Sequence, residues 1–352
     1  MTVISTTHGI SASSEISIPN KQALWEPGKY SLHDAWFPVA HSRNINTQIV
    51  RRFVHAQPIF LWRKGKQLQA SEFHPANLKK QRHQAGPFTG GSGHYPVVDR
   101  YGYAWVWYGN PERADIELIP DIPFISSVRG SPAYANLNNY FHCTYELVLE
   151  NILDLTHIDF VHGNYGGTYE SEDDKIAVKS TSETITMIRT TTKRPTSEYQ
   201  KKVLSIRVPY QDVTFFTHVF IRSGLCFLHA HYSAAPSMPL MQNNTPESRF
   251  LTRVDSTFGV EQCDDTNYRH AWPTTGPMVA AQDESMLNPQ NPRYILKQPA
   301  RDMNTRFDTA GLLFRRRFMS LVERQQQGDF SYLADTADGS DLAEVLNVKR
   351  LS

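Results

Sequence analysis

The sequence predicts an α+β fold, on two observations. Short apolar runs with β character occupy the first third of the chain, as in Trp36–Ala40, Pro58–Trp62 and Tyr103–Tyr108. Longer runs rich in Thr, Val, Ile and Phe follow, with a helical pattern before them and two helical patterns after them. Strands and helices that are grouped rather than strictly alternating are typical of antiparallel sheets with helices packed on them.

The elements expected in the second part of the chain are a helix, several long strands and two further helices. The stretch 73–94, with its glycines, prolines and three histidines, is expected to be loop, as is the segment around Asn243 to Thr245. The predicted ranges are helix Tyr145 to His162, strands 176–192, 202–208, 213–232 and 250–258, and helices 278–287 and 303–327.

The length of 352 residues predicts two domains, at about 150 residues for each. Residues 1–30 are polar and rich in Ser and Thr, so we expect a loosely held N-terminal arm. A Pro-containing linker suggests a boundary near Phe124, which separates a β-domain over 31–124 from a larger domain over 125–352.

The charge balance excludes two classes of partner. With 36 basic and 35 acidic residues the net charge is +1, so there is no electrostatic case for binding nucleic acid or an anionic membrane. The start of the chain has no signal-peptide pattern, and no apolar stretch approaches the length of about 18 residues that a membrane span needs. We therefore expect a cytoplasmic protein.

The three cysteines limit the chemistry further. Cys143, Cys226 and Cys263 are odd in number and widely spaced, which excludes a disulfide scaffold. They also exclude any four-cysteine metal or iron-sulfur site built by this chain alone.

The segment from Glu150 to His162, ENILDLTHIDFVH, is the most informative for chemistry. On a helix Asn151, Asp154 and His157 would lie along one stripe, where the Asp154 carboxylate could accept the ring N–H of His157. His162 follows His157 by five residues, about 140° around an ideal helix, so both could bind one metal only if the helix bends or ends between them.

A third metal ligand is expected because two imidazoles and one carboxylate form the facial triad of non-haem Fe(II) oxygenases. The candidate is Asp283 in the helix-forming stretch AAQDESML. From the residues alone the neighbouring Glu284 remains an alternative.

The run ENILDLTHIDFVH resembles the catalytic-domain signature of Rieske-type non-haem iron oxygenases, especially the vanillate O-demethylase-like branch. Four further segments resemble the same branch and occur in the same order: the strand-like AWFPVA, PIFLWR and DRYGYAWVWYGNPERAD, and QDESML near the end of the chain. The resemblance covers most of residues 31–325.

The resemblance implies roles for five residues. His157, His162 and Asp283 would be ligands of a mononuclear Fe(II), Asp154 the carboxylate through which electrons arrive, and Asn151 a neighbour of the metal. The implied fold is a Rieske-like β-domain followed by a helix-grip catalytic domain, assembled as a head-to-tail trimer.

The chain departs from the family in its first domain. A Rieske [2Fe-2S] cluster needs two cysteines and two histidines there, yet no cysteine precedes Cys143. The pattern Cys226-x-x-His229 lies in a strand-like run where alternation places the two side chains on opposite faces, and no C-x-H partner exists. We therefore expect a degenerate Rieske-like domain that binds no [2Fe-2S] cluster.

The function expected from these features is hydroxylation or O- or N-demethylation of a small aromatic or heterocyclic substrate with O2. Electrons would come from a Rieske-bearing partner, either another oxygenase subunit in a trimer or hetero-hexamer or a reductase with an extra Rieske domain. The second arrangement is similar to bacterial methylxanthine N7-demethylase systems. The alternatives are a catalytically silent structural subunit and a helix-grip module that binds an apolar ligand.

Overall fold

The computed structural model describes residues 32–120, 133–166, 174–234, 240–259, 266–295 and 304–334. The expected N-terminal arm over 1–30, the domain boundary near Phe124 and the start of the last helix at Met303 lie outside these residues. Among the described helices, none combines the length and the apolar character needed to cross a membrane.

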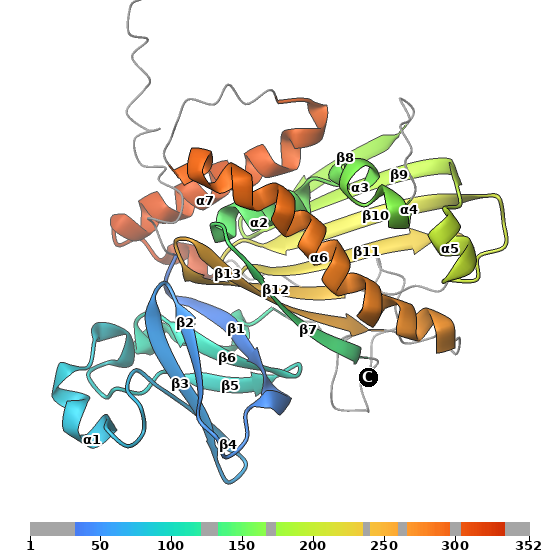
Figure 1. Ribbon diagram of the computed structural model, residues 1–352. Coiled ribbons are helices and arrows are strands. Elements are labelled where there is room, and N and C mark those ends of the chain that lie inside the picture. Colours follow the sequence, from blue (N-terminus) through green and yellow to red (C-terminus); the bar gives the residue numbers. More distant parts are fainter. Residues whose placement is uncertain are drawn as a thin grey trace, which may run out of the picture.

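The first part of the chain forms two three-stranded antiparallel sheets that enclose a small apolar core (Figure 1). One sheet has the order β1–β6–β5 and the other β2–β3–β4. Their bounds are β1 Ala35–His41, β2 Val50–Val54, β3 Gln57–Lys64, β4 Gln67–Ser71, β5 Val97–Arg100 and β6 Tyr103–Tyr108. The predicted apolar runs are strands, whereas polar β4 had no signal in the sequence.

The stretch 73–94 is mostly irregular, as expected, with short turns of helix such as α1 (Leu78–Gln81). The side chains of His83 and His94 are exposed, and the ring of His74 packs against Phe60.

The second part of the chain is a seven-stranded antiparallel sheet of order β7–β13–β12–β11–β10–β9–β8. Its strands are β7 Ala133–Phe141, β8 Lys175–Ser180, β9 Thr184–Pro195, β10 Tyr210–Phe220, β11 Leu225–Tyr232, β12 Leu240–Ser248 and β13 Leu251–Gly259. The α+β expectation is therefore confirmed.

One loop prediction and one strand prediction were wrong, and the ranges 176–192 and 213–232, each predicted as one strand, are antiparallel pairs of strands, β8–β9 and β10–β11. The loop expected around Asn243 is the centre of β12, where Asn243 and Asn244 are buried and Asn244 donates to the Gly224 carbonyl at 2.8 Å. The strand expected over 202–208 is instead the end of α5 (Glu198–Lys202) and the coil after it, because Ser197 and Gln200 form a capping box that starts a helix there.

Helices cover one face of the large sheet (Figure 1). Helix α6 (Thr266–Ile295) crosses the sheet and is much longer than the predicted 278–287, and it continues through Pro277, Pro289 and Pro292, residues that usually end or kink a helix. Helix α2 (Tyr145–Leu153) packs between the sheet and α7 (Thr309–Gln326), and its Glu150 pairs with Arg315 of α7 at 2.6 Å.

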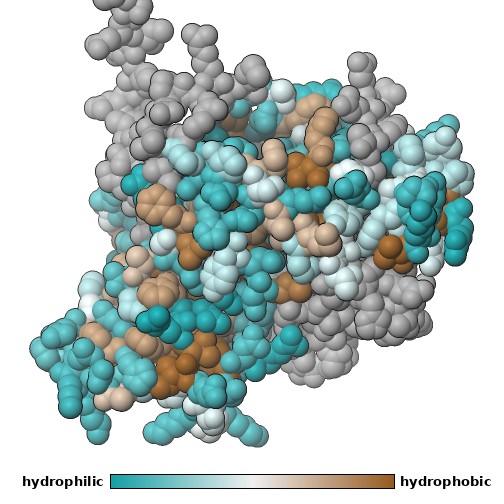
Figure 2. All heavy atoms as spheres, in the orientation of Figure 1, coloured by the Kyte–Doolittle hydropathy of each residue, from teal (hydrophilic) through white to brown (hydrophobic). Residues whose placement is uncertain are grey.

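The opposite face of the large sheet packs against the N-terminal sheets. One buried aromatic cluster joins them, with Trp36, Trp105 and Trp107 from the first part and Phe216, Phe220 and Phe227 from β10 and β11. Figure 2 shows a mostly hydrophilic outer face with small groups of hydrophobic side chains. The two parts of the chain thus share a core, and the site lies on the helix-covered side of the sheet.

Candidate metal centre

The helix predicted over Tyr145 to His162 is interrupted at Asp154. Helix α2 ends at Leu153, and Asp154 is extended with φ −95° and ψ 94°. A new helix, α3 (His157–Val161), begins after the turn, and His162 follows it as the C-cap. Helix α3 therefore ends at Val161, between His157 and His162, which is the condition under which both side chains can bind one metal.

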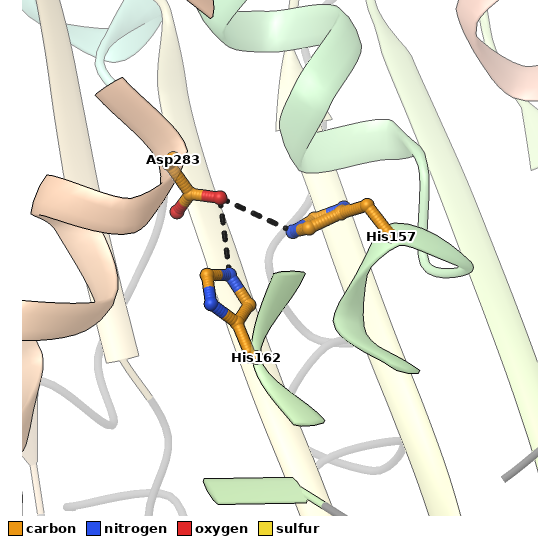
Figure 3. A group of neighbouring side chains, drawn as sticks. All are labelled: His157, His162 and Asp283. Carbon is orange, nitrogen blue, oxygen red and sulfur yellow. Dashed lines mark ion pairs between the residues drawn. The ribbon is translucent and has the colours of Figure 1, made fainter. Parts of the chain in front are cut away.

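The side chains of His157, His162 and Asp283 converge between α3 and α6 (Figure 3). Asp283 Oδ1 lies 3.0 Å from His162 Nε2 and 3.4 Å from His157 Nε2. Two ligand atoms on adjacent positions of a metal with bonds of about 2.1 Å are about 3 Å apart, so both carboxylate–imidazole distances suit a shared ion, and all three ligand atoms lie within 4.8 Å of one another.

Each imidazole is oriented by a hydrogen bond at Nδ1, the ring nitrogen that does not face Asp283. His162 Nδ1 donates to Gln282 Oε1 at 2.9 Å, and His157 Nδ1 donates to the backbone carbonyl of Asp154. A proton on Nδ1 leaves the lone pair on Nε2, which is the tautomer that a metal needs. Gln282 was missed in the sequence, although it lies directly before Asp283.

The charge of the triad follows from its geometry. Burial raises the pKa of Asp283, but the imidazoles of His157 and His162 beside it outweigh burial and lower the pKa to about 2. Burial lowers the pKa of His157, and the neighbouring Asp283 carboxylate more than compensates, so the net shift is upward. Asp283 is therefore an ionised carboxylate, and its buried Oδ1 forms no hydrogen bond within the described residues although it faces the Nε2 atoms of both rings.

The structure separates the two acidic candidates on α6. Asp283 points at the two histidines, whereas Glu284 accepts a hydrogen bond of 2.6 Å from Nδ1 of the exposed His142. Asp283 is thus the acid that completes the cluster.

The expected stripe of Asn151, Asp154 and His157 on one helix is wrong, because α2 ends before Asp154. The Asp154 carboxylate does not reach the His157 ring; its Oδ1 accepts from the backbone N–H and hydroxyl of Thr156, at 2.9 and 2.5 Å. Only the Asp154 backbone carbonyl meets the ring of His157. Asn151, on the last turn of α2, lines the cavity beside His157.

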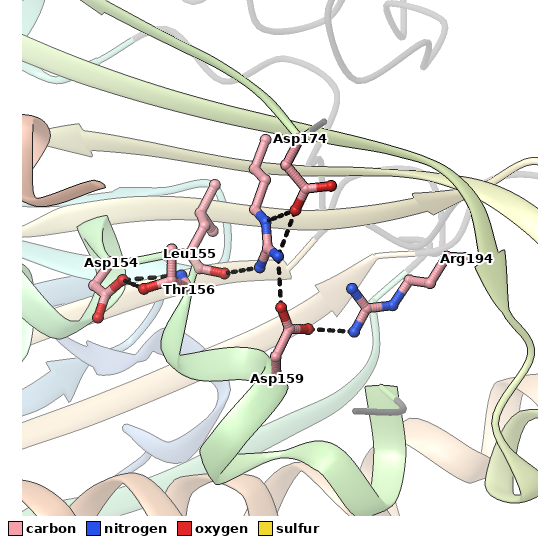
Figure 4. A network of polar contacts seen from close by, with 7 residues as sticks. Asp154, Leu155, Thr156, Asp159, Asp174 and Arg194 are labelled. Carbon is pink, nitrogen blue, oxygen red and sulfur yellow. Dashed lines mark hydrogen bonds and ion pairs between the residues drawn. The ribbon is translucent and has the colours of Figure 1, made fainter. Parts of the chain in front are cut away.

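A buried ion network holds the segment around His157 (Figure 4). Arg189 of β9 donates to the Leu155 carbonyl at 3.0 Å and pairs with Asp159 and Asp174, both at 2.5 Å. Asp159 also pairs with the buried Arg194. The network therefore fixes the backbone on both sides of His157.

A cavity of about 210 Å³ lies between the sheet and helices α2, α3 and α6, and all three clustered side chains line it. Most of the other lining residues are apolar, including Leu155, Ile158, Phe215, Leu228 and Val279.

The described cysteines take no part in the cluster. Cys143 and Cys226 are buried free thiols, and burial raises the pKa of the Cys226 thiol well above its usual range. Cys263 lies outside the described residues.

Residues 141–324 match the family model of the vanillate O-demethylase oxygenase C-terminal domain. The chain is 32% identical over 106 residues to the vanillate O-demethylase oxygenase subunit of Pseudomonas sp. (strain ATCC 19151), which is 30% of each chain. It is 40% identical over 70 residues to the oxygenase component of dicamba O-demethylase from Stenotrophomonas maltophilia, or 19% of this chain and 20% of that one. The aligned stretches thus span less than a third of these curated relatives.

The fold is similar to that of dicamba monooxygenase bound to 3,6-dichlorosalicylic acid, with a TM-score of 0.72 and 17% identity. This match covers 84% of the present chain and 99% of the other. The family model covers more than half of the chain and contains all three clustered side chains. The chain therefore belongs to the vanillate O-demethylase-like branch of the Rieske-type oxygenases.

Proposed function

We propose that this chain is the catalytic subunit of a multicomponent non-haem iron monooxygenase that hydroxylates or demethylates a small aromatic or heterocyclic compound. The observation that carries the proposal is the convergence of His157, His162 and Asp283 at the wall of a largely apolar cavity. Fe(II) bound by two imidazoles and one carboxylate would supply the activation of O2.

The protein orients the two imidazoles toward the metal position and excludes water from the cavity. Gln282 and the Asp154 carbonyl keep both Nε2 lone pairs directed at the metal position. The apolar lining holds the substrate next to that position, and Asn151 offers a carboxamide at the same wall.

Electrons would arrive from a separate protein, since no cysteine precedes Cys143 and the first part of the chain cannot supply the thiolates of a [2Fe-2S] cluster. We assign the entry point to Asp154, which is partly exposed and whose carboxyl carbon is three bonds from the backbone carbonyl carbon that holds His157. A Rieske-bearing oxygenase subunit in a trimer or hetero-hexamer, or a reductase with an extra Rieske domain, would dock there. The free thiols of Cys143 and Cys226 are compatible with a cytoplasmic location.

Metal and sulfide analysis of the purified chain after anaerobic Fe(II) loading tests this proposal. We expect about one iron per chain and no labile sulfide, and His157→Ala should lose the iron. His142→Ala is the matched control, because His142 is exposed and pairs with Glu284 outside the triad. Stoichiometric sulfide, or wild-type protein that binds no iron, would overturn it.

Turnover driven by peroxide in the absence of a partner is the second test, with methoxy-aromatic and N-methyl heterocyclic compounds. Product formation that His157→Ala abolishes supports the oxygenase. The apolar cavity is equally suited to an apolar-ligand binding module. Ligand binding by an iron-loaded chain that forms no product with peroxide or with electron donors would favour that module, or a silent subunit, instead.

A further inference from the structure

The size and the lining of the cavity limit which substrates it can bind. Its volume of about 210 Å³ lies below the range of about 300–1,000 Å³ that is usual for drug-sized ligands, so the substrate is small. The sheet side of the cavity is formed by residues of β7 and of β10 to β13, and on β7, β12 and β13 they are alternate residues, since successive side chains point to opposite faces.

No lysine or arginine is among the described residues that line the cavity. The buried guanidinium groups of Arg189 and Arg194 are paired with Asp159. A carboxylate or sulfonate held in the apolar part of this cavity, away from the metal position, would lose its hydration without gaining a lysine or arginine partner, which is costly.

Thr217 is a polar group in the cavity wall with no partner of its own. It lies on β10 between Phe215 and Val219, on the face that belongs to the helix-side core. The residue is 2% exposed, and its Oγ1 forms no hydrogen bond within the described residues. A buried hydroxyl without a partner costs free energy, so a ligand atom that hydrogen-bonds to it would be bound selectively.

A pair of polar side chains lies on strands β12 and β13 of the same sheet. Gln242 and Ser256 face each other in the β12–β13 register, and both line the cavity. The Gln242 side-chain N–H donates to Asn244 Oδ1 at 2.9 Å, which leaves its carbonyl oxygen as an acceptor.

We propose that the substrate is an uncharged aromatic or heterocyclic compound with a hydrogen-bonding substituent, and that Thr217 recognises that substituent. The inference rests on the proposed function for the reaction, but the binding preference is independent of turnover. Thr217 acts here as a specificity residue, and the apolar wall selects against ionised acids.

Calorimetric binding to the Co(II)-loaded chain tests the charge preference with two probes of equal size. We use 4-methoxybenzamide and 4-methoxybenzoate at pH 8, where the benzoate is fully ionised. The amide should bind at least about tenfold more tightly than the acid. Equal or tighter binding of the acid would overturn the proposal.

The role of Thr217 is tested with three variants and a third probe. Thr217→Val should weaken binding of 4-methoxybenzamide about fivefold and leave that of methoxybenzene within about twofold, whereas Thr217→Ser should bind like the wild type. Thr190→Val is the control, since Thr190 Oγ1 faces Thr214 on the neighbouring strand and does not line the cavity. Equal weakening of both probes by Thr217→Val would exclude selective recognition. An intact binding preference without demethylated product would contradict the proposed function and not this inference.

Discussion

Arg189 and Asp159 form a buried ion pair, with 2.5 Å between Nη2 and Oδ2. The same guanidinium holds the Leu155 carbonyl, so one side chain of β9 fixes the chain immediately before and after His157. His157, the proposed metal ligand at the start of a helix of only five residues, is thereby held by the sheet rather than by the helix itself.

Arg189→Met should lower both the stability and the metal affinity of the chain. The change leaves the carboxylates of Asp159 and Asp174 buried with one cation fewer, which typically costs about 3–5 kcal/mol of unfolding free energy. Urea unfolding and Co(II) titration measure the two effects. Arg222→Met is the control, because Arg222 pairs with buried Glu183 away from α3. Equal losses of metal affinity in both variants would show that Arg189 has no specific role at the site.

Gln282→Leu should weaken metal binding by about 10–100-fold with little change in stability, because it removes the acceptor that fixes the His162 tautomer. Equilibrium dialysis against Fe(II) or Co(II) measures this change. Gln290→Leu, on the same helix, removes only an exposed hydrogen bond to the Met286 carbonyl and should bind metal like the wild type. Unchanged metal affinity in Gln282→Leu would contradict the role of Gln282 in orienting the His162 ring.

Asp154→Asn should keep the iron and the peroxide-driven reaction but lose most turnover driven by the electron-donating partner. The asparagine oxygen can still accept from Thr156, so the turn before His157 persists while the negative charge is removed. Steady-state rates with the partner and with peroxide give the comparison. Normal rates with the partner would exclude Asp154 as the electron entry point.

Acid should destabilise the fold through two buried histidines. Burial lowers the pKa of His41 and of His218 to about 4 each, from 6.5 in the unfolded chain. Between these values the unfolded state binds more protons, so the stabilising contribution is complete above pH 6.5 and is lost as the pH falls toward 4. Each histidine should contribute a slope of about 1.4 kcal/mol per pH unit in that window.

Urea unfolding at pH 7.5 and at pH 5 measures this loss. His41→Phe should reduce the pH dependence by one histidine's share, because it removes a buried ring whose two nitrogens have no hydrogen-bond partner within the described residues. An unchanged slope in this variant would mean that His41 is not the group that titrates.

The sequence predicts His157 and His162 because their spacing is local information, whereas Asp283 is predicted through the family resemblance, since the residues alone leave Glu284 as an alternative. It does not predict the break at Asp154, since Asn151, Asp154 and His157 also fit one stripe of a straight helix. Strand β12 escapes prediction because its buried positions are polar, and their partners lie on other strands. Gln282 is recognised only through a contact across 120 residues, between α6 and the end of α3.

The aromatic cluster behind the large sheet gives the N-terminal part of the chain a structural task. Trp36, Trp105 and Trp107 shield Phe220 and Phe227 from water, and those rings are 0% exposed in the intact chain. Deleting the first 120 residues would uncover an aromatic surface of the kind that drives aggregation. The N-terminal part of the chain therefore serves as a watertight back wall for the sheet that carries the cavity, so the catalytic domain is not expected to stay monodisperse without it.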